Sequence, residues 1–129
     1  MVDVRLSPLR EFAKRAADAS LKLPRRKSSV LPTLPEVNVI LVSDRRIAGI
    51  HARFMSEPGP TDVITFQHGE VFISTETAKR QAQKFGTTLE HELRLYIAHG
   101  LLHLHGYDDT TRAGAAEMKR VQEKLAATC

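Results

Sequence analysis

The stretch from Leu89 to His105 is apolar on nearly every side of the helix that its spacing predicts. One face carries Leu93, Ile97, Leu101 and Leu104, and the other carries Leu95 and Leu102. A helix that is apolar all round is buried inside a protein rather than laid on its surface. The rest of the chain is therefore expected to fold around this segment.

Two histidines interrupt the apolar stretch. His99 and His103 are four residues apart, which corresponds to about 400° of turn and about 6 Å of rise, so both rings point to the same side. A buried imidazole without a partner costs on the order of 1–3 kcal/mol. The two rings could each be hydrogen-bonded to backbone, or one metal ion could satisfy both. The residues that follow favour the metal ion.

A third ligand is available directly after the helix. Gly106 is expected to end the helix, so that the chain turns back and Asp109 can supply an oxygen ligand. Two nitrogens and one carboxylate leave one position of a tetrahedral zinc ion open, as in catalytic rather than structural sites. Mixed imidazole and carboxylate ligands without thiolates favour Zn²⁺, with Mn²⁺ or Ni²⁺ as further candidates. Asp109 could instead cap the last helix, a role open also to Thr110 or Thr111.

The neighbours of these three residues refine the hypothesis of metal-assisted hydrolysis. His105 lies off the ligand side and is expected at the surface or behind the ligands, while Tyr107 and Asp108 are the nearest candidates to orient them. Zinc proteases place a glutamate base after the first helical histidine. This chain has Gly100 there, which disfavours a peptidase and favours close approach of a strand or substrate backbone. Glu92 is too far along the helix to serve as the base, and no other general base can be identified.

The remaining elements predict an α+β fold, with a small mixed β-sheet covered by helices and the metal-ligand helix buried at its centre. Strands are expected over 2–6, 37–42, 62–66 and 70–73, the last two forming a hairpin. Helices are expected over about 9–21, 44–55, 74–86 and 111–127, in addition to 89–105. Ser7, Ser74 and Thr87 with Glu90 are the expected caps, and Gly86 is an expected helix end. The 129 residues are expected to form a single domain.

Composition narrows the partners. The net charge of +4 and the pI of about 9.5 suit a polyanion such as nucleic acid, although many other proteins share them. Aromatic residues are few, so no base-stacking platform is obvious. No apolar run approaches the roughly 20 residues of a membrane span, and no secretory signal is predicted. The lone cysteine, Cys129, excludes an internal disulfide and favours a reducing, cytoplasmic location.

The segment from His99 to Asp109 resembles the hallmark of the YbeY family, bacterial rRNA maturation factors described as single-strand-specific metallo-endoribonucleases. That hallmark reads His-Gly-x-Leu-His-Leu-x-Gly-Tyr-Asp, followed by His or Asp, and the chain matches it with Asp109 in the last position. The segments 60–66 and 69–74 resemble two further family blocks in the same order. The resemblance extends over about residues 37–125.

The resemblance implies one catalytic zinc ion on His99, His103 and Asp109, and a role in 16S rRNA 3′-end maturation and ribosome quality control. Single-stranded RNA and the ribosome or small-subunit proteins are the implied partners, and metal-activated water is the implied nucleophile. The family usually has an arginine and an asparagine where this chain has Met55 and His51.

Some candidates for binding RNA come from the chain itself. Arg45, Arg46 and Arg53 could hold the phosphates, with Arg53 close enough on its helix to compensate for Met55. Thr61 and Asp62, at a junction between loop and strand, could line the cleft or simply end the loop.

Two alternatives to a ribonuclease stay open at this point. One is a zinc amidase or peptidase-like hydrolase that uses the same ion. The other is a non-enzymatic ribosome-assembly factor in which the metal only clips the last helix onto the fold, and Met55 favours this second alternative. The oligomeric state is not predicted.

Overall fold

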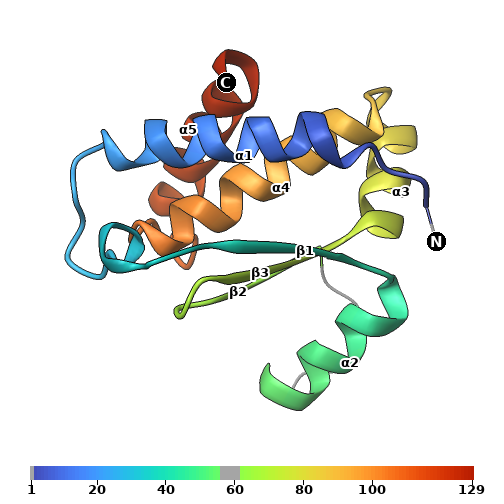
Figure 1. The fold of residues 1–129 in the computed structure, drawn as a ribbon, viewed down its shortest axis with the longest axis horizontal. Helices are drawn as coiled ribbons and strands as arrows, with labels where there is room; N and C mark the ends of the chain where they lie inside the picture. Colours follow the sequence, from blue (N-terminus) through green and yellow to red (C-terminus); the bar gives the residue numbers. More distant parts are fainter. Residues whose placement is uncertain (1, 56–61) are drawn as a thin grey trace.

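The computed structural model describes residues 2–55 and 62–129. Its elements occur in the order α1 (Leu6–Leu21), a short 3-10 turn (Leu31–Thr33), β1 (Asn38–Val42), α2 (Asp44–Met55), β2 (Val63–Phe66), β3 (Glu70–Ser74), α3 (Thr75–Phe85), α4 (Leu89–Leu104) and α5 (Arg112–Thr128). The helices α1, α4 and α5 lie on one side of the sheet and α2 on the other (Figure 1). This arrangement confirms the α+β prediction.

The sheet has the strand order β1-β3-β2. β1 runs parallel to β3, and β2 pairs antiparallel with β3 as the predicted hairpin, so the sheet is mixed. Gly69 has a positive φ of 107° in the hairpin turn, and its N–H donates to the Phe66 carbonyl over 2.9 Å. Glycine adopts this backbone conformation without the steric cost that a β-carbon brings.

The main core surrounds α4. Side chains on every side of this helix are buried, and they pack with the inner faces of α1, α5 and the sheet. A second, smaller cluster fills the space between α2 and the opposite sheet face: Val42, Ile47 and Ile64, with Ile40, Ile50, Phe66 and Phe72 packed around them. The predicted burial of the ligand helix is therefore confirmed.

Three local predictions are wrong. Residues 2–5 form no strand, and Val4 is apolar because it packs against the main core. α1 begins at Leu6 rather than after Ser7, and no side chain caps it. Pro8 lies in the first turn of α1, where backbone N–H groups have no intrahelical acceptor, so the N–H that proline lacks is not missed.

The third correction concerns the start of α4. Its cap is Thr88, whose hydroxyl accepts from His91 N–H over 3.1 Å, rather than Thr87 with Glu90. The Thr87 hydroxyl instead donates to Glu92 over 2.9 Å, so Glu92 is a buried, paired acid of the first turn. Ser74 and Gly86 act as predicted: Ser74 accepts from Thr77 N–H at the start of α3, and Gly86 ends α3 with φ 68°.

Candidate metal centre

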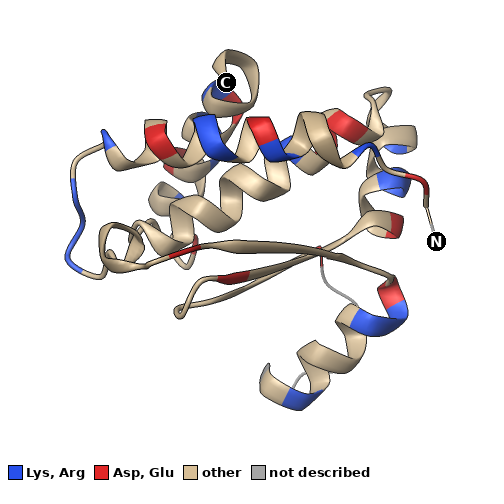
Figure 2. Cartoon of the chain, in the orientation of Figure 1, with Lys and Arg blue, Asp and Glu red and all other residues tan. Residues whose placement is uncertain are grey.

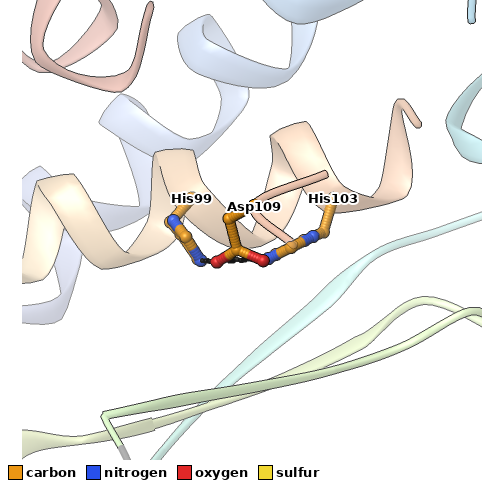
Figure 3. A group of neighbouring side chains, drawn as sticks. All are labelled: His99, His103 and Asp109. Atoms are coloured by element: carbon orange, nitrogen blue, oxygen red, sulfur yellow. Dashed lines mark hydrogen bonds and ion pairs between the residues drawn. The ribbon is translucent and has the colours of Figure 1, made fainter. Parts of the chain in front are cut away.

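His99, His103 and Asp109 point their ligand atoms at one another (Figure 3). The two Nε2 atoms are 3.0 Å apart, and Asp109 Oδ2 lies 3.6 Å from His99 Nε2 and 3.7 Å from His103 Nε2. Ligands bonded to zinc at 2.0–2.2 Å in tetrahedral geometry lie roughly 3.3–3.6 Å from one another. The three observed distances lie within about 0.3 Å of this range, so small side-chain shifts would bring all three atoms to one small divalent cation.

Hydrogen bonds behind the rings fix which nitrogen faces the cluster. His103 Nδ1 lies 3.2 Å from the Tyr107 carbonyl oxygen, and His99 Nδ1 lies 2.8 Å from Gln122 Oε1. Because both oxygens accept, each Nδ1 carries the proton and each Nε2 presents a lone pair. The lone pairs of the two Nε2 atoms, 3.0 Å apart, repel each other. A cation bound between the two atoms would remove this repulsion by accepting both lone pairs.

Burial keeps the cluster ready for a cation. Desolvation lowers the pKa of His103 below its ordinary value, and the neighbouring His99 lowers it further. The neutral ring is the form that binds metal. Asp109 supplies a negative charge from a side chain that is 43% exposed, so one side of the cluster is open to solvent. These donors fit the predicted divalent metal ion.

The turn after α4 places Asp109. Gly106 adopts φ 93° directly after the helix, as expected for a helix-ending glycine. Thr111 caps α5 by accepting from Gly114 N–H over 2.9 Å, so Asp109 is not needed as a cap. Asp108 accepts from the backbone and hydroxyl of Thr110, and these bonds hold the pKa of Asp108 below its usual range. Of the two roles considered for Asp109, capping α5 is excluded, because Thr111 is the cap.

The loop before β1 supports this turn. The Arg26 guanidinium lies 3.9 Å from the centre of the Tyr107 ring and pairs with Glu117 of α5 over 2.8 Å. His105 is buried, with Nδ1 3.0 Å from Ser29 Oγ and Nε2 3.1 Å from the Leu23 carbonyl. Both ring nitrogens of His105 therefore have partners in the core, and of the two positions expected for this ring, at the surface or behind the ligands, the surface position is wrong.

Gly100 allows the sheet to approach α4. A β-carbon at this position would lie 2.6 Å from Val71 Cγ1 and 3.2 Å from Val71 Cγ2. No real side chain tolerates such contacts without a shift of the neighbour. Of the two predicted reasons for Gly100, close approach of a strand is the one that the structure shows.

Of the three predicted RNA-binding residues Arg53, Thr61 and Asp62, the structure describes Arg53 and Asp62. Arg53 is on α2, on the opposite side of the sheet from α4. Asp62 directly precedes β2 and accepts a hydrogen bond from Val63 N–H over 2.8 Å. Burial raises the pKa of Tyr96 on α4, and the negative charge of Asp62 raises it further. Thr61 lies outside the described residues. The helices α4, with its two candidate ligands, and α5 were both predicted, but Gln122 of α5, which hydrogen-bonds to His99, was missed. Its place on the inner face of α5 was the available signal.

Fold and cluster together define an α+β protein with a His-His-Asp site of the kind used in metal-dependent hydrolysis. The family model for "Endoribonuclease YbeY" matches residues 2–129, and the chain belongs to this family. The predicted resemblance is thereby confirmed. None of the helices that the structure describes is long and apolar enough to cross a membrane.

Individual relatives agree. The chain is 36% identical over 115 residues to an endoribonuclease YbeY of Frankia alni, covering 74% of this chain and 64% of that relative. It is 37% identical over 103 residues to the Thermus thermophilus protein of the same name, covering 70% and 74%. The chain therefore spans slightly less than two thirds of the Frankia relative's length. The solution structure of TM1509 from Thermotoga maritima matches with a TM-score of 0.65 and 30% identity, over 94% of this chain and 78% of that one.

Proposed function

We propose that this chain is a zinc-dependent endoribonuclease that cleaves single-stranded RNA and acts in 16S rRNA 3′-end maturation and ribosome quality control. Membership of the endoribonuclease family supports the reaction class and the RNA substrate. The convergence of His99, His103 and Asp109 is the observation that carries the metal dependence. The cytoplasm, where rRNA is processed, is the proposed location, and the ribosome or its small-subunit proteins are the proposed partners.

In this proposal the two histidines and Asp109 hold one Zn²⁺. A divalent ion at such a site lowers the pKa of water toward neutrality and stabilises negative charge that develops on a phosphate. The protein's part is to orient the ligands: Gln122 and the Tyr107 carbonyl keep a proton on each Nδ1, and both Nε2 atoms face the ion. Neither ligand histidine is then free to act as the general base.

The structure bears on both alternatives. For a zinc peptidase, the position after His99 is Gly100, and Val71 fills the space where a glutamate side chain would begin. For a non-enzymatic factor, the metal would have to clip α5 onto the fold. However, α5 already packs against α4 through the buried side chains of Met118, Val121 and Leu125. A structural clip is therefore not required.

The test is cleavage of a single-stranded RNA oligonucleotide by purified protein with zinc and by the His103→Ala variant. We expect the variant to lose at least a hundredfold in rate while keeping its helical circular dichroism spectrum. His91→Ala, an exposed histidine at the start of the same helix, is the matched control and should retain the full rate. Undiminished cleavage by His103→Ala would refute the proposal, and cleavage of peptides but not RNA would favour the amidase alternative.

A further inference from the structure

The sheet face opposite the metal centre carries a second feature, a groove of about 910 Å³. α2 forms one wall, and the β2–β3 hairpin forms the other. The two faces are distinguished by neighbouring residues of β3: Val71 faces Gly100 of α4, whereas Phe72 lines the groove. The groove is therefore separated from His99 and His103 by the sheet.

Positive charge gathers along this groove. Arg45, Arg46 and Arg53 line it, and all three are exposed. Figure 2 shows the corresponding basic stretches near both ends of α2. Glu70 brings one carboxylate to the groove, and it pairs with His68 over 2.6 Å. The net positive charge of the groove attracts a polyanion and repels a basic partner.

Aromatic rings lie beside the arginines. Phe66 makes edge contacts with Phe54 at 5.5 Å and with Phe72 at 5.9 Å between centroids, and it stacks on His68 at 5.6 Å. Phe54 is 59% exposed, although it is large and apolar. Although the chain has few aromatic residues, the fold thus brings several of them together. Rings for base stacking beside cations for phosphates are the usual elements of single-strand binding.

The α2 wall of the groove contains a glycine, Gly49, whose presence helix stability does not explain. Gly49 lies in the middle of α2, exposed, and a β-carbon there would meet no atom within 4 Å. Alanine would stabilise the helix relative to glycine by roughly 0.5–1 kcal/mol. Neither a positive φ nor a close neighbour requires glycine at this position. The missing side chain leaves the groove wider between Arg45 and Arg53.

We propose that this groove binds a segment of single-stranded RNA, with the arginines on its phosphates and the exposed rings against its bases. The inference rests on the proposed function for its choice of RNA, and it assigns a binding surface separate from the metal centre. Duplex RNA keeps its bases stacked on one another and cannot offer them to Phe54. The groove is therefore specific for unpaired strands.

Binding is measured by fluorescence anisotropy with a labelled twelve-nucleotide oligouridine. The protein is the 129-residue chain carrying His103→Ala, so that the strand is not cut. On this background we expect Arg45→Gln and Arg53→Gln each to raise Kd several-fold and to reduce the slope of log Kd against log salt by about one. Phe54→Ala is expected to raise Kd at least fivefold. Arg10→Gln on α1 makes the same charge change on the other side of the sheet and should leave Kd within twofold.

Gly49→Leu separates binding from folding. Leucine favours helix and fills only open space, so the melting temperature should stay equal or rise, while Kd for oligouridine increases at least tenfold. A blunt RNA duplex of equal length should bind at least tenfold more weakly than oligouridine. The inference is overturned if Gly49→Leu and Phe54→Ala both bind oligouridine as tightly as the His103→Ala background does. It is also overturned if the RNA duplex binds as tightly as oligouridine. A third contrary result is that Gly49→Leu weakens binding of an acidic peptide but leaves Kd for oligouridine unchanged.

The test of the groove and the test of the metal mechanism can fail independently of each other. If His103→Ala still cleaves RNA, the metal mechanism fails, yet the effects of Gly49→Leu and Phe54→Ala on binding of a non-cleaved strand at 4 °C still test the groove. If the groove variants bind normally while His103→Ala abolishes cleavage, the groove inference fails and the metal mechanism stands.

Discussion

Gln122 Oε1 lies 2.8 Å from His99 Nδ1 and so joins the middle of α5 to the ligand side of α4. This contact fixes the tautomer of His99 and the direction of its ring. Partners of this kind, behind a ligand, commonly account for 10–100-fold in metal affinity. The contact thus makes α5, although it supplies no candidate ligand, part of the candidate metal centre.

Replacement of Gln122 by leucine removes the acceptor and keeps the side-chain bulk. We expect zinc affinity, measured by competition with a chromogenic chelator, to fall about 10–100-fold. Gln122→Glu keeps an oxygen acceptor for the His99 N–H and should retain zinc affinity at least at the wild-type level. Equal zinc affinity of the leucine variant and the wild type would show that the contact does not position the ring.

Gly100→Ala tests the close approach of α4 to β3. The added β-carbon would overlap Val71, and overpacking of this kind costs about 1–3 kcal/mol, more than the gain of up to about 1 kcal/mol in helix propensity. We therefore expect urea denaturation to show a lower free energy of unfolding. Gly49→Ala makes the same substitution in open space and should raise it. In the Val71→Ala background, Gly100→Ala should cost nothing, and an undiminished cost there would exclude the Val71 contact as its cause.

Local patterns were enough to predict the α+β class, the order of the elements after residue 37, and the candidate ligands His99, His103 and Asp109, whose binding of a metal stays a prediction. The spacing of His99 and His103, the cap at Ser74 and the end at Gly86 all depend on residues within one turn of each other, and these predictions were confirmed. Gln122 and the α2 groove depend on contacts between residues far apart in the chain, which periodicity does not report. Residues 2–6 were misread because a short apolar alternation fits a strand and also an irregular segment with Val4 in the core.

His105 differs from the ligand histidines in a way that substitution can reveal. Its two ring nitrogens are satisfied by Ser29 and the Leu23 carbonyl, so His105→Ala leaves both partners unpaired in the core. We expect a loss of roughly 2–4 kcal/mol in the free energy of unfolding. At a temperature where the variant is folded, zinc content should stay at one ion per chain. Loss of zinc from folded His105→Ala would show that this ring contributes to the metal centre.

Asp44 predicts the behaviour in acid. The Arg80 guanidinium, with hydrogen bonds from Ser74 and Thr77, lowers the pKa of Asp44 from 3.8 to about 2. Since the folded state holds the proton less tightly, this stabilisation is present above about pH 4 and is lost as the pH falls toward 2. Because Arg80 is more than half exposed, screening limits its size to about 1 kcal/mol.

Asp44→Asn should therefore lower the free energy of unfolding at pH 7 by about 1 kcal/mol. The difference between variant and wild type should shrink between pH 4 and pH 2. Asp18→Asn, on the exposed side of α1, is the control and should leave the free energy of unfolding unchanged at pH 7. A difference between Asp44→Asn and wild type that is constant from pH 7 to pH 2 would contradict this assignment.

The central claim is that His99, His103 and Asp109 bind one zinc ion together. An anomalous difference map from zinc-loaded crystals, collected on both sides of the zinc absorption edge, tests it directly. The account predicts a single peak about 2.0–2.2 Å from His99 Nε2, His103 Nε2 and an Asp109 carboxylate oxygen. A peak elsewhere with this cluster empty, or a bound ion with Asp109 turned away from it, would contradict the account.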